Sequence, residues 1–151
     1  MKTLQLLFKT HGTAPLVARL TLGIVMFPHG AQKMLGWFGG HGFTGTMGFF
    51  TGTMHIPAFF ALLAILAEFA GSLGLITGLL SRVAAFGIAV TMVVAVLTSH
   101  AANGFFMNWL GNQKGEGFEY HVLAMALALT LMLRGAGALS ADRLIAEKVR
   151  S

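Results

Sequence analysis

Apolar runs alternate along the chain with short stretches rich in glycine and polar residues. The runs cover residues 14–36, 57–79, 82–101 and 119–134, and the first of them is mixed with polar positions. An α-helix of about 20 apolar residues crosses the hydrocarbon core of a membrane. The pattern therefore predicts an all-α, polytopic membrane protein. We expect its four transmembrane helices to form one bundle, and the 151 residues leave room for a single domain, 1–151.

The first predicted span, residues 14–36, carries side chains that a bilayer disfavours. They are Arg19, His29, Gln32 and Lys33. Polar groups at membrane depth normally turn toward partners or a cavity, so this helix is expected to form one wall of a site. Lys33 lies at the helix end, from which its long side chain can also reach the outer membrane interface.

Glu68 is a lone carboxylate near the centre of the second predicted span, residues 57–79. A carboxylate in an apolar helix must be neutralised, protonated or solvated. If the first two helices run antiparallel, helical rise brings Arg19 to a similar depth, and we expect the two residues to pair. The pair either fixes the register of the bundle or provides a proton-accepting group at the base of a cavity.

Two short helices are predicted outside the spans. The pentapeptide FTGTM occurs at residues 43–47 and again at 50–54. This repeat spacing places phenylalanines and methionines on one face of an interfacial helix in the first outer loop, which acts either as a lid or as a membrane anchor. Near the C-terminus, Ser140 is placed to cap a helix over residues 142–149.

Basic residues gather on one side of the predicted spans. They are Lys2, Lys9, Arg82, Arg134, Arg143, Lys148 and Arg150. The positive-inside rule therefore places both termini and the short C-terminal helix in the cytoplasm. The net charge is +5, but the basic residues form no stripe with interleaved aromatic residues, so we expect no nucleic-acid partner.

The chain contains no cysteine. This composition excludes disulfides, thiolate metal ligands and iron–sulfur clusters held by the chain itself. We also predict no metal site, because no two histidines have the i, i+4 spacing that fixes a metal on one helix.

Polar residues in the outer half of three spans are expected to converge on one pocket, with Glu68 below them. They are His29, Gln32, Lys33, His100, Glu119, Tyr120 and His121, roofed by the FTGTM segment and by Trp37 or Trp109. A quinone or quinol headgroup needs an apolar slot with groups that bind its oxygens and move protons. A b-type haem would instead use two of the histidines, and this is the less favoured interpretation.

Several short motifs, in their order and spacing, resemble the DoxX family of small four-helix membrane proteins. They are Arg19 with Gly23, His29-Gly30-x-Gln32-Lys33 followed by Gly36-Trp37-Phe38-Gly39-Gly40, Glu68 with Gly71 through Arg82, and Gly135-x-Gly137-x-x-Ser140-x-Asp142. The resemblance implies a protein of the bacterial or archaeal cytoplasmic (inner) membrane. The wider group includes the membrane subunits of thiosulfate:quinone oxidoreductase and relatives tied to quinone detoxification and oxidative stress.

Three hypotheses for the function follow. The first is a redox-associated subunit, of a quinone-linked oxidoreductase with a partner chain, that binds quinone or quinol and uses Arg19 and Glu68 as a catalytic pair. Its cofactor contacts would be His29, Gln32, Lys33, Trp37, His100, Glu119 and His121. The second is a non-enzymatic scaffold for oxidoreductases, and the third is a small-molecule or proton-coupled transporter, which the absence of a clear inverted repeat disfavours. The sequence does not fix the oligomeric state and allows a homo-oligomer.

Overall fold

The computed structural model describes residue 10 and residues 12–148, and within them every regular element is a helix. The long helices are α2 (Ala14–Leu35), α4 (Ala58–Thr77), α5 (Ser81–Ala95) and α6 (Glu119–Arg134). Two shorter helices are α3 (Gly42–Gly48), which continues into a π-helical turn (Phe49–Thr53), and α7 (Ala141–Lys148). The predicted all-α class is confirmed for the described part of the chain.

Three helical segments are long and apolar enough to cross a membrane. They are α2, α4 and Ser81–Asn103, in which α5 continues through a π-helical turn (Val96–His100) and a 3₁₀ turn (Ala101–Asn103). Helix α6 has 16 residues, fewer than a full span requires. The described residues therefore contain three candidate spans, and a fourth span at α6 stays a prediction.

Some of the residues used for the sequence predictions lie outside the described part of the chain. These are Lys2, Lys9 and Arg150 of the basic set, and residue 149 of the predicted C-terminal helix. The described helices α3 and α7 occupy the positions of the two short predicted helices. Their placement at a membrane surface stays a prediction.

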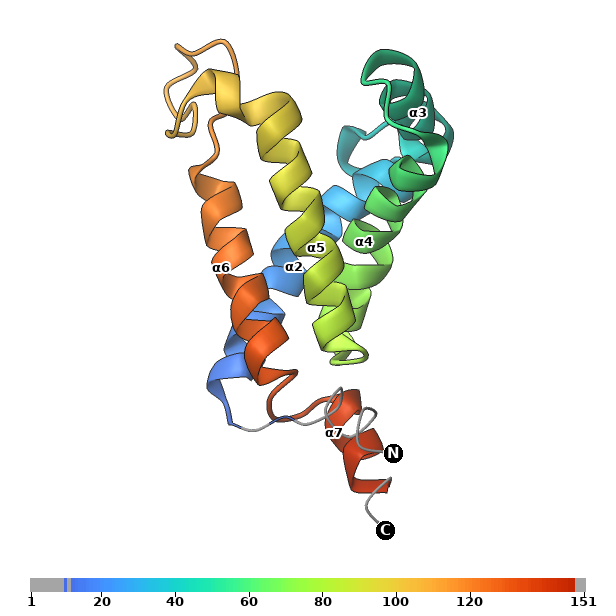
Figure 1. Cartoon of the computed structure of the whole chain (residues 1–151), viewed down its shortest axis with the longest axis vertical. Helices are drawn as coiled ribbons and strands as arrows, with labels where there is room; N and C mark the ends of the chain where they lie inside the picture. The colour runs from blue at the N-terminus through green and yellow to red at the C-terminus, as the bar shows by residue number, and fades with distance from the viewer. Residues whose placement is uncertain (1–9, 11, 149–151) are drawn as a thin grey trace.

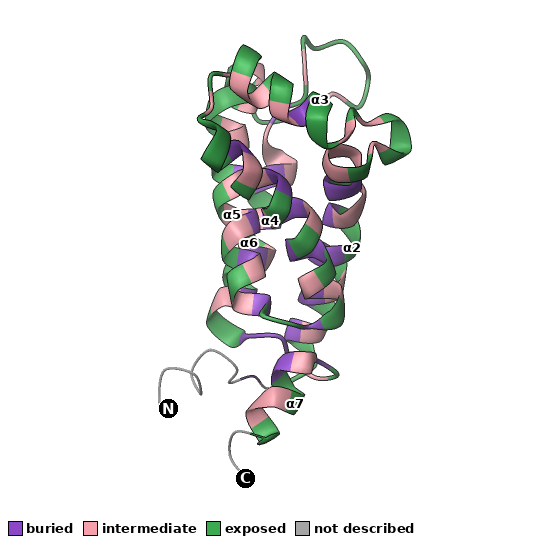
Figure 2. Cartoon of the chain, turned by 90° about the vertical axis from the view of Figure 1, so that its right-hand side faces the viewer, coloured by how far each residue is buried: buried purple, intermediate pink, exposed green. Residues whose placement is uncertain are grey.

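The long helices pack in a V-shaped arrangement. Helix α2 contacts both α4 and α6, while α5 lies between α4 and α6 and contacts each. Figure 1 shows α4 and α5 close together at the lower end, near the chain ends, and apart at the upper end, which carries α3 and the α5–α6 connection. Each of the four long helices contains buried residues, as the colours in Figure 2 show.

Helices α2 and α4 touch backbone to backbone at Gly30. A Cβ atom added at Gly30 would lie 2.5 Å from the Cα atom of Phe69 and 2.7 Å from the carbonyl carbon of Glu68. Closer to the N-terminus of α2, a Cβ atom at Gly23 would lie 3.0 Å from Cγ1 of Ile76. Gly30 fixes the antiparallel register of α2 on α4, because a Cβ atom there would overlap the α4 backbone, and Gly23 adds a second close contact between the two helices.

Many large apolar side chains remain exposed on the outside of the bundle. Phe59, Phe86, Leu97 and Leu133 are 65%, 56%, 73% and 69% exposed. Soluble monomers rarely show such continuous apolar surfaces. These faces match what lipid tails would cover around a helical bundle.

We expect Gly30→Ala to lower the free energy of unfolding by about 2 kcal/mol, because the added methyl group overlaps the α4 backbone. Thermal or denaturant unfolding in detergent measures this change. Gly48→Ala is the matched control, since Gly48 is helical and an added Cβ there meets nothing within 4 Å. An equal effect of the two substitutions would contradict the proposed role of Gly30.

Candidate functional site: a cavity with polar side chains at its upper end

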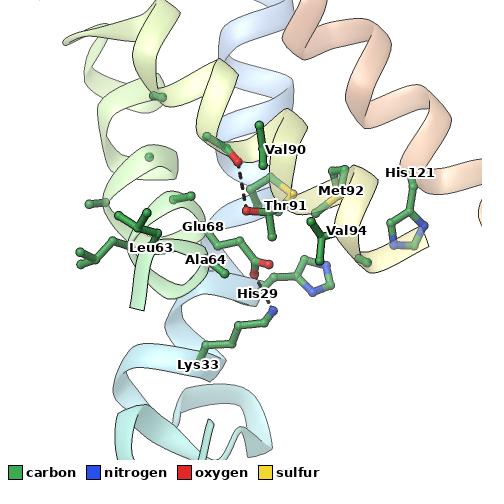
Figure 3. A pocket seen from close by; sticks show the side chains of 18 of the residues that line it. His29, Lys33, Leu63, Ala64, Glu68, Val90, Thr91, Met92, Val94 and His121 are labelled. Carbon is green, nitrogen blue, oxygen red and sulfur yellow. Dashed lines mark hydrogen bonds and ion pairs between the residues drawn. The ribbon is translucent and has the colours of Figure 1, made fainter. Parts of the chain in front are cut away.

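A cavity of 1330 Å³ lies between α4 and α5 and extends toward the upper ends of α2 and α6. Most of its lining is apolar and comes from α4 and α5. The ionisable side chains in the lining are His29, Lys33, Glu68, His100, Glu116, Tyr120 and His121. Figure 3 shows His29 next to Lys33 and Glu68, with His121 on the far side of His29.

Glu68 forms an ion pair with Lys33, with 2.5 Å between Oε2 and Nζ. The Glu68 side chain is 5% exposed and that of Lys33 is 26% exposed. One prediction is therefore wrong: Glu68 pairs with Lys33 and not with Arg19. The physical reason is that Gly30 lies against the backbone of Glu68 and Phe69, and Lys33 follows Gly30 by about one turn of the same helix.

Arg19 binds backbone carbonyl groups at the lower end of the bundle instead. Its guanidinium donates to the carbonyl oxygens of Leu75 (2.6 Å) and Ile76 (2.7 Å) in the last turn of α4. It also donates to those of Ala136 and Leu139, each at 3.1 Å, in the segment after α6. Arg19 is 1% exposed and does not line the cavity. Its hydrogen bonds connect α2 to the last turn of α4 and to the segment after α6.

Asp142 makes further hydrogen bonds to backbone groups at the same end of the bundle. Its carboxylate accepts hydrogen bonds from the backbone N–H groups of Leu80 (2.7 Å) and Ser81 (2.9 Å), at the start of α5. Its own N–H donates to the carbonyl oxygen of Gly78 at 2.8 Å. A Cβ atom at Gly78 would overlap Ser140 and lie 3.1 Å from Cζ of Arg19. The glycine-rich motif around residues 135–142 therefore has a structural role here.

The rings of Tyr120 and three histidines lie close together at the upper end of the bundle. The rings of His100 and His121 lie 4.2 Å apart between centroids. The Tyr120 ring lies 5.5 Å from that of His121 and 6.0 Å from that of His29, which comes from α2. The Tyr120 hydroxyl donates to Sδ of Met26 at 3.3 Å. The structure thus brings together three of the predicted histidines, from three different helical segments.

The ring nitrogens of His100 and His121 differ in their hydrogen bonds to the described residues. Nδ1 of His100 is 2.9 Å from the carbonyl oxygen of Glu116. His121 is 6% exposed, its Nδ1 is completely buried, and no hydrogen bond joins either ring nitrogen to the described residues. Leaving a buried polar group unsatisfied costs about 1–3 kcal/mol. Nδ1 of His121 is therefore a group to which a ligand in the cavity could bind.

Besides Arg19, three of the predicted cofactor contacts do not line the cavity. Gln32 donates from Nε2 to the carbonyl oxygen of Phe38 at 3.2 Å. Trp37 is 53% exposed in the turn that follows α2. Oε1 of Glu119 accepts hydrogen bonds from the N–H of Met107 (3.0 Å) and from Nε1 of Trp109 (3.3 Å). These polar groups organise the connections at the upper end rather than the cavity.

Part of the predicted roof does lie over the cavity. Phe50 and Met54, from the second copy of the FTGTM repeat, line it together with the preceding Phe49, whereas Trp109 is 84% exposed and does not. Sequence reasoning missed Glu116 and Thr91, which also line the cavity. A single polar residue in a loop or in an apolar helix gives no periodic signal that marks it. Within the described residues, no group of three or more histidine or acidic side chains is placed to hold a metal ion.

An all-helical chain with three candidate spans and polar groups buried between them is an integral membrane protein. The chain belongs to the DoxX family, whose model matches residues 14–101. It is 30% identical over 141 residues to "Inner membrane protein YqjF" of Escherichia coli (strain K12), covering 93% of this chain and 98% of that protein. It is 28% identical over 123 residues to "Putative oxidoreductase CatD" of Bacillus subtilis (strain 168), covering 82% and 81%. No solved structure is significantly similar to the chain. The predicted family is thus confirmed.

Double-mutant cycles distinguish the observed ion pair from the predicted one. We expect Lys33→Met or Glu68→Gln alone to destabilise the protein by about 3 kcal/mol, since each leaves its partner uncompensated. The double variant should lose less unfolding free energy than the two single variants lose together, and the difference, the coupling energy, should be about 1–3 kcal/mol. For Arg19→Lys and Glu68→Gln, the loss of unfolding free energy in the double variant should equal the sum of the two single losses within about 0.5 kcal/mol. Unfolding in detergent gives these values, and coupling of Glu68 to Arg19 but not to Lys33 would refute the assignment.

Proposed function

We propose that the chain is a redox-associated membrane subunit that binds the headgroup of a quinone or quinol in the cavity between α4 and α5. The observation that carries the proposal is the cavity itself, whose apolar walls lead to a small group of polar side chains. Ligand sites in proteins commonly combine mostly apolar walls with a few polar groups that fix orientation. A quinone likewise combines an apolar ring with polar oxygens, so each part of the ligand has a matching part of the cavity.

The residues at the upper end of the cavity suit such a headgroup. Lys33 has N–H donors beyond the one that binds Glu68, and these can bind a carbonyl oxygen. Glu68 is the group placed to accept a proton from a quinol hydroxyl. Arg19, which the sequence predicted as its catalytic partner, is engaged with carbonyl groups away from the cavity. The catalytic role is therefore proposed for Glu68 without Arg19.

The geometry favours a quinone over a haem. The rings of His100 and His121 contact each other directly, which leaves no room for a porphyrin between them. The names of the two relatives also support a redox role and an inner-membrane location, since one is called an oxidoreductase and the other an inner membrane protein. Because the chain has no cysteine to carry electrons, we propose that an oxidoreductase partner chain exchanges electrons with the quinone.

We further propose that α6 is the fourth span and that the lower end of the bundle faces the cytoplasm. The length of α6 is about 24 Å, so it crosses most of the hydrocarbon core. The described basic residues Arg82, Arg134, Arg143 and Lys148 are at or below the lower helix ends. The positive-inside rule favours this end for the cytoplasm.

Purified protein should retain a quinone in its lipid extract, which chromatography and mass spectrometry identify. His29→Ala should weaken binding of a tail-shortened quinone about tenfold, because His29 lies in the cavity beside the ion pair. Calorimetric titration in detergent measures this affinity. His41→Ala is the control, since His41 is exposed and does not line the cavity. If neither extraction nor titration finds a quinone, the proposal fails and the scaffold hypothesis gains support.

The absence of cysteine makes the topology directly testable with single-cysteine variants. Asn112→Cys, in the α5–α6 connection, should react with a membrane-impermeant maleimide added to intact cells. Glu147→Cys, in α7, should react only after the membrane is permeabilised. Both positions are exposed. The opposite labelling pattern would invert the proposed orientation, and labelling of both from outside would contradict an even number of spans.

A further inference from the structure

We infer that one ligand ring bridges two polar groups on opposite walls of the cavity. The first is the ion-pair pole, Lys33 with Glu68, and the second is the histidine pole, His121 with His100. This inference rests on the proposed function and narrows it: the ligand carries two oxygens at opposite positions of its ring, as a para-quinone or para-hydroquinone does, and His121 binds one of them.

The two poles belong to different pairs of helices. Lys33 lies in α2 and Glu68 in α4, while His121 lies in α6 and His100 in the turn after α5. These pairs diverge toward the upper end of the bundle, as Figure 1 shows. All four side chains line the same cavity. A small molecule between the walls would therefore meet a polar group on each side.

Each pole keeps hydrogen-bonding capacity that the protein does not use. Neither ring nitrogen of His121 is hydrogen-bonded to a described residue, although the side chain is more than nine-tenths buried. In the ion-pair pole, Lys33 and Glu68 share a single hydrogen bond through Oε2, and no described residue binds the other carboxylate oxygen. A ligand oxygen can bind at either pole without breaking an existing contact.

The surface between the poles suits an aromatic ring. Tyr120 lies between His29 and His121, with centroid distances of 6.0 Å and 5.5 Å. Its hydroxyl is directed to Sδ of Met26, so it does not compete for the ligand. Its ring is available for the offset or edge contacts that aromatic groups prefer at such separations. A planar ring is thus expected between the poles.

Discrimination between ligands with one and two oxygens follows from this arrangement. A ligand that lacks one oxygen leaves the corresponding pole unsatisfied, and sites built to hydrogen-bond a group reject analogues that lack it. For one hydrogen bond between neutral groups we expect a difference of about tenfold in affinity.

The test compares three ligands with the same tail: a decyl-substituted para-hydroquinone and the two decylphenols that each lack one of its hydroxyls. The full-length protein in detergent should bind the hydroquinone about tenfold more tightly than either phenol. In His121→Phe, hydroquinone affinity should fall about tenfold, and the preference over one phenol should disappear. The phenol whose hydroxyl lies at the ion-pair pole should bind this variant as it binds the wild type, which also shows that the variant is folded.

Two further variants complete the experiment. His121→Gln keeps a hydrogen-bonding group and should restore part of the preference, whereas His41→Phe changes an exposed histidine outside the cavity and should alter nothing. Equal affinity of the wild type for all three ligands would overturn the two-pole inference while leaving the quinone site intact. An unchanged preference in His121→Phe would also overturn it. Failure of all three ligands to bind would overturn the proposed function as well.

Discussion

The structure depends on neutralising one carboxylate inside an apolar bundle. Glu68 lies in the middle of α4 and is almost completely buried, so the free energy of folding includes the cost of removing its charge from water. Lys33 offsets this cost only if α2 lies very close to α4, and Gly30 permits that approach by letting the two backbones touch. The ion pair and the glycine contact therefore form one unit. Together they hold a charged but electrically balanced group at the edge of the cavity.

The two ends of the bundle use their buried polar groups differently. At the lower end, Arg19 makes four hydrogen bonds to carbonyl groups, and Asp142 accepts two from backbone N–H groups. These contacts satisfy helix ends that would otherwise expose orphan groups, so they stabilise the fold. At the upper end, His121 is buried without a hydrogen bond to any described residue. The hydrogen bonds of Arg19 and Asp142 therefore anchor the helices at the lower end, whereas at the upper end the buried Nδ1 of His121 is open to a ligand that lies in the cavity.

The sequence predicted the helices and the convergence of His29, His100 and His121, because apolar runs and rare polar positions are strong signals in a membrane protein. It did not predict the partner of Glu68. The error came from comparing depths by helical rise without the register that the glycines impose. Arg19 lies eleven residues from Gly30, about 16 Å along the helix, whereas Lys33 lies three residues from it. Glycines on the Arg19 and Lys33 face of α2 were the available signal. The roles of Gln32 and Glu119 depend on loop geometry, which no periodic pattern encodes.

The charge balance of the cavity bears on which ligands it accepts. The charges of Lys33 and Glu68 balance each other, and the other ionisable side chains in the lining are three histidines, one tyrosine and the carboxylate of Glu116. An anionic ligand would lose its hydration on entering between apolar walls, and it would meet Lys33, whose charge Glu68 already compensates, and the acidic Glu116. A neutral ring with polar oxygens avoids this penalty and gains hydrogen bonds from groups that the protein leaves unused. The same arrangement that stabilises Glu68 in the membrane thus favours an uncharged, quinone-like ligand over an anionic one.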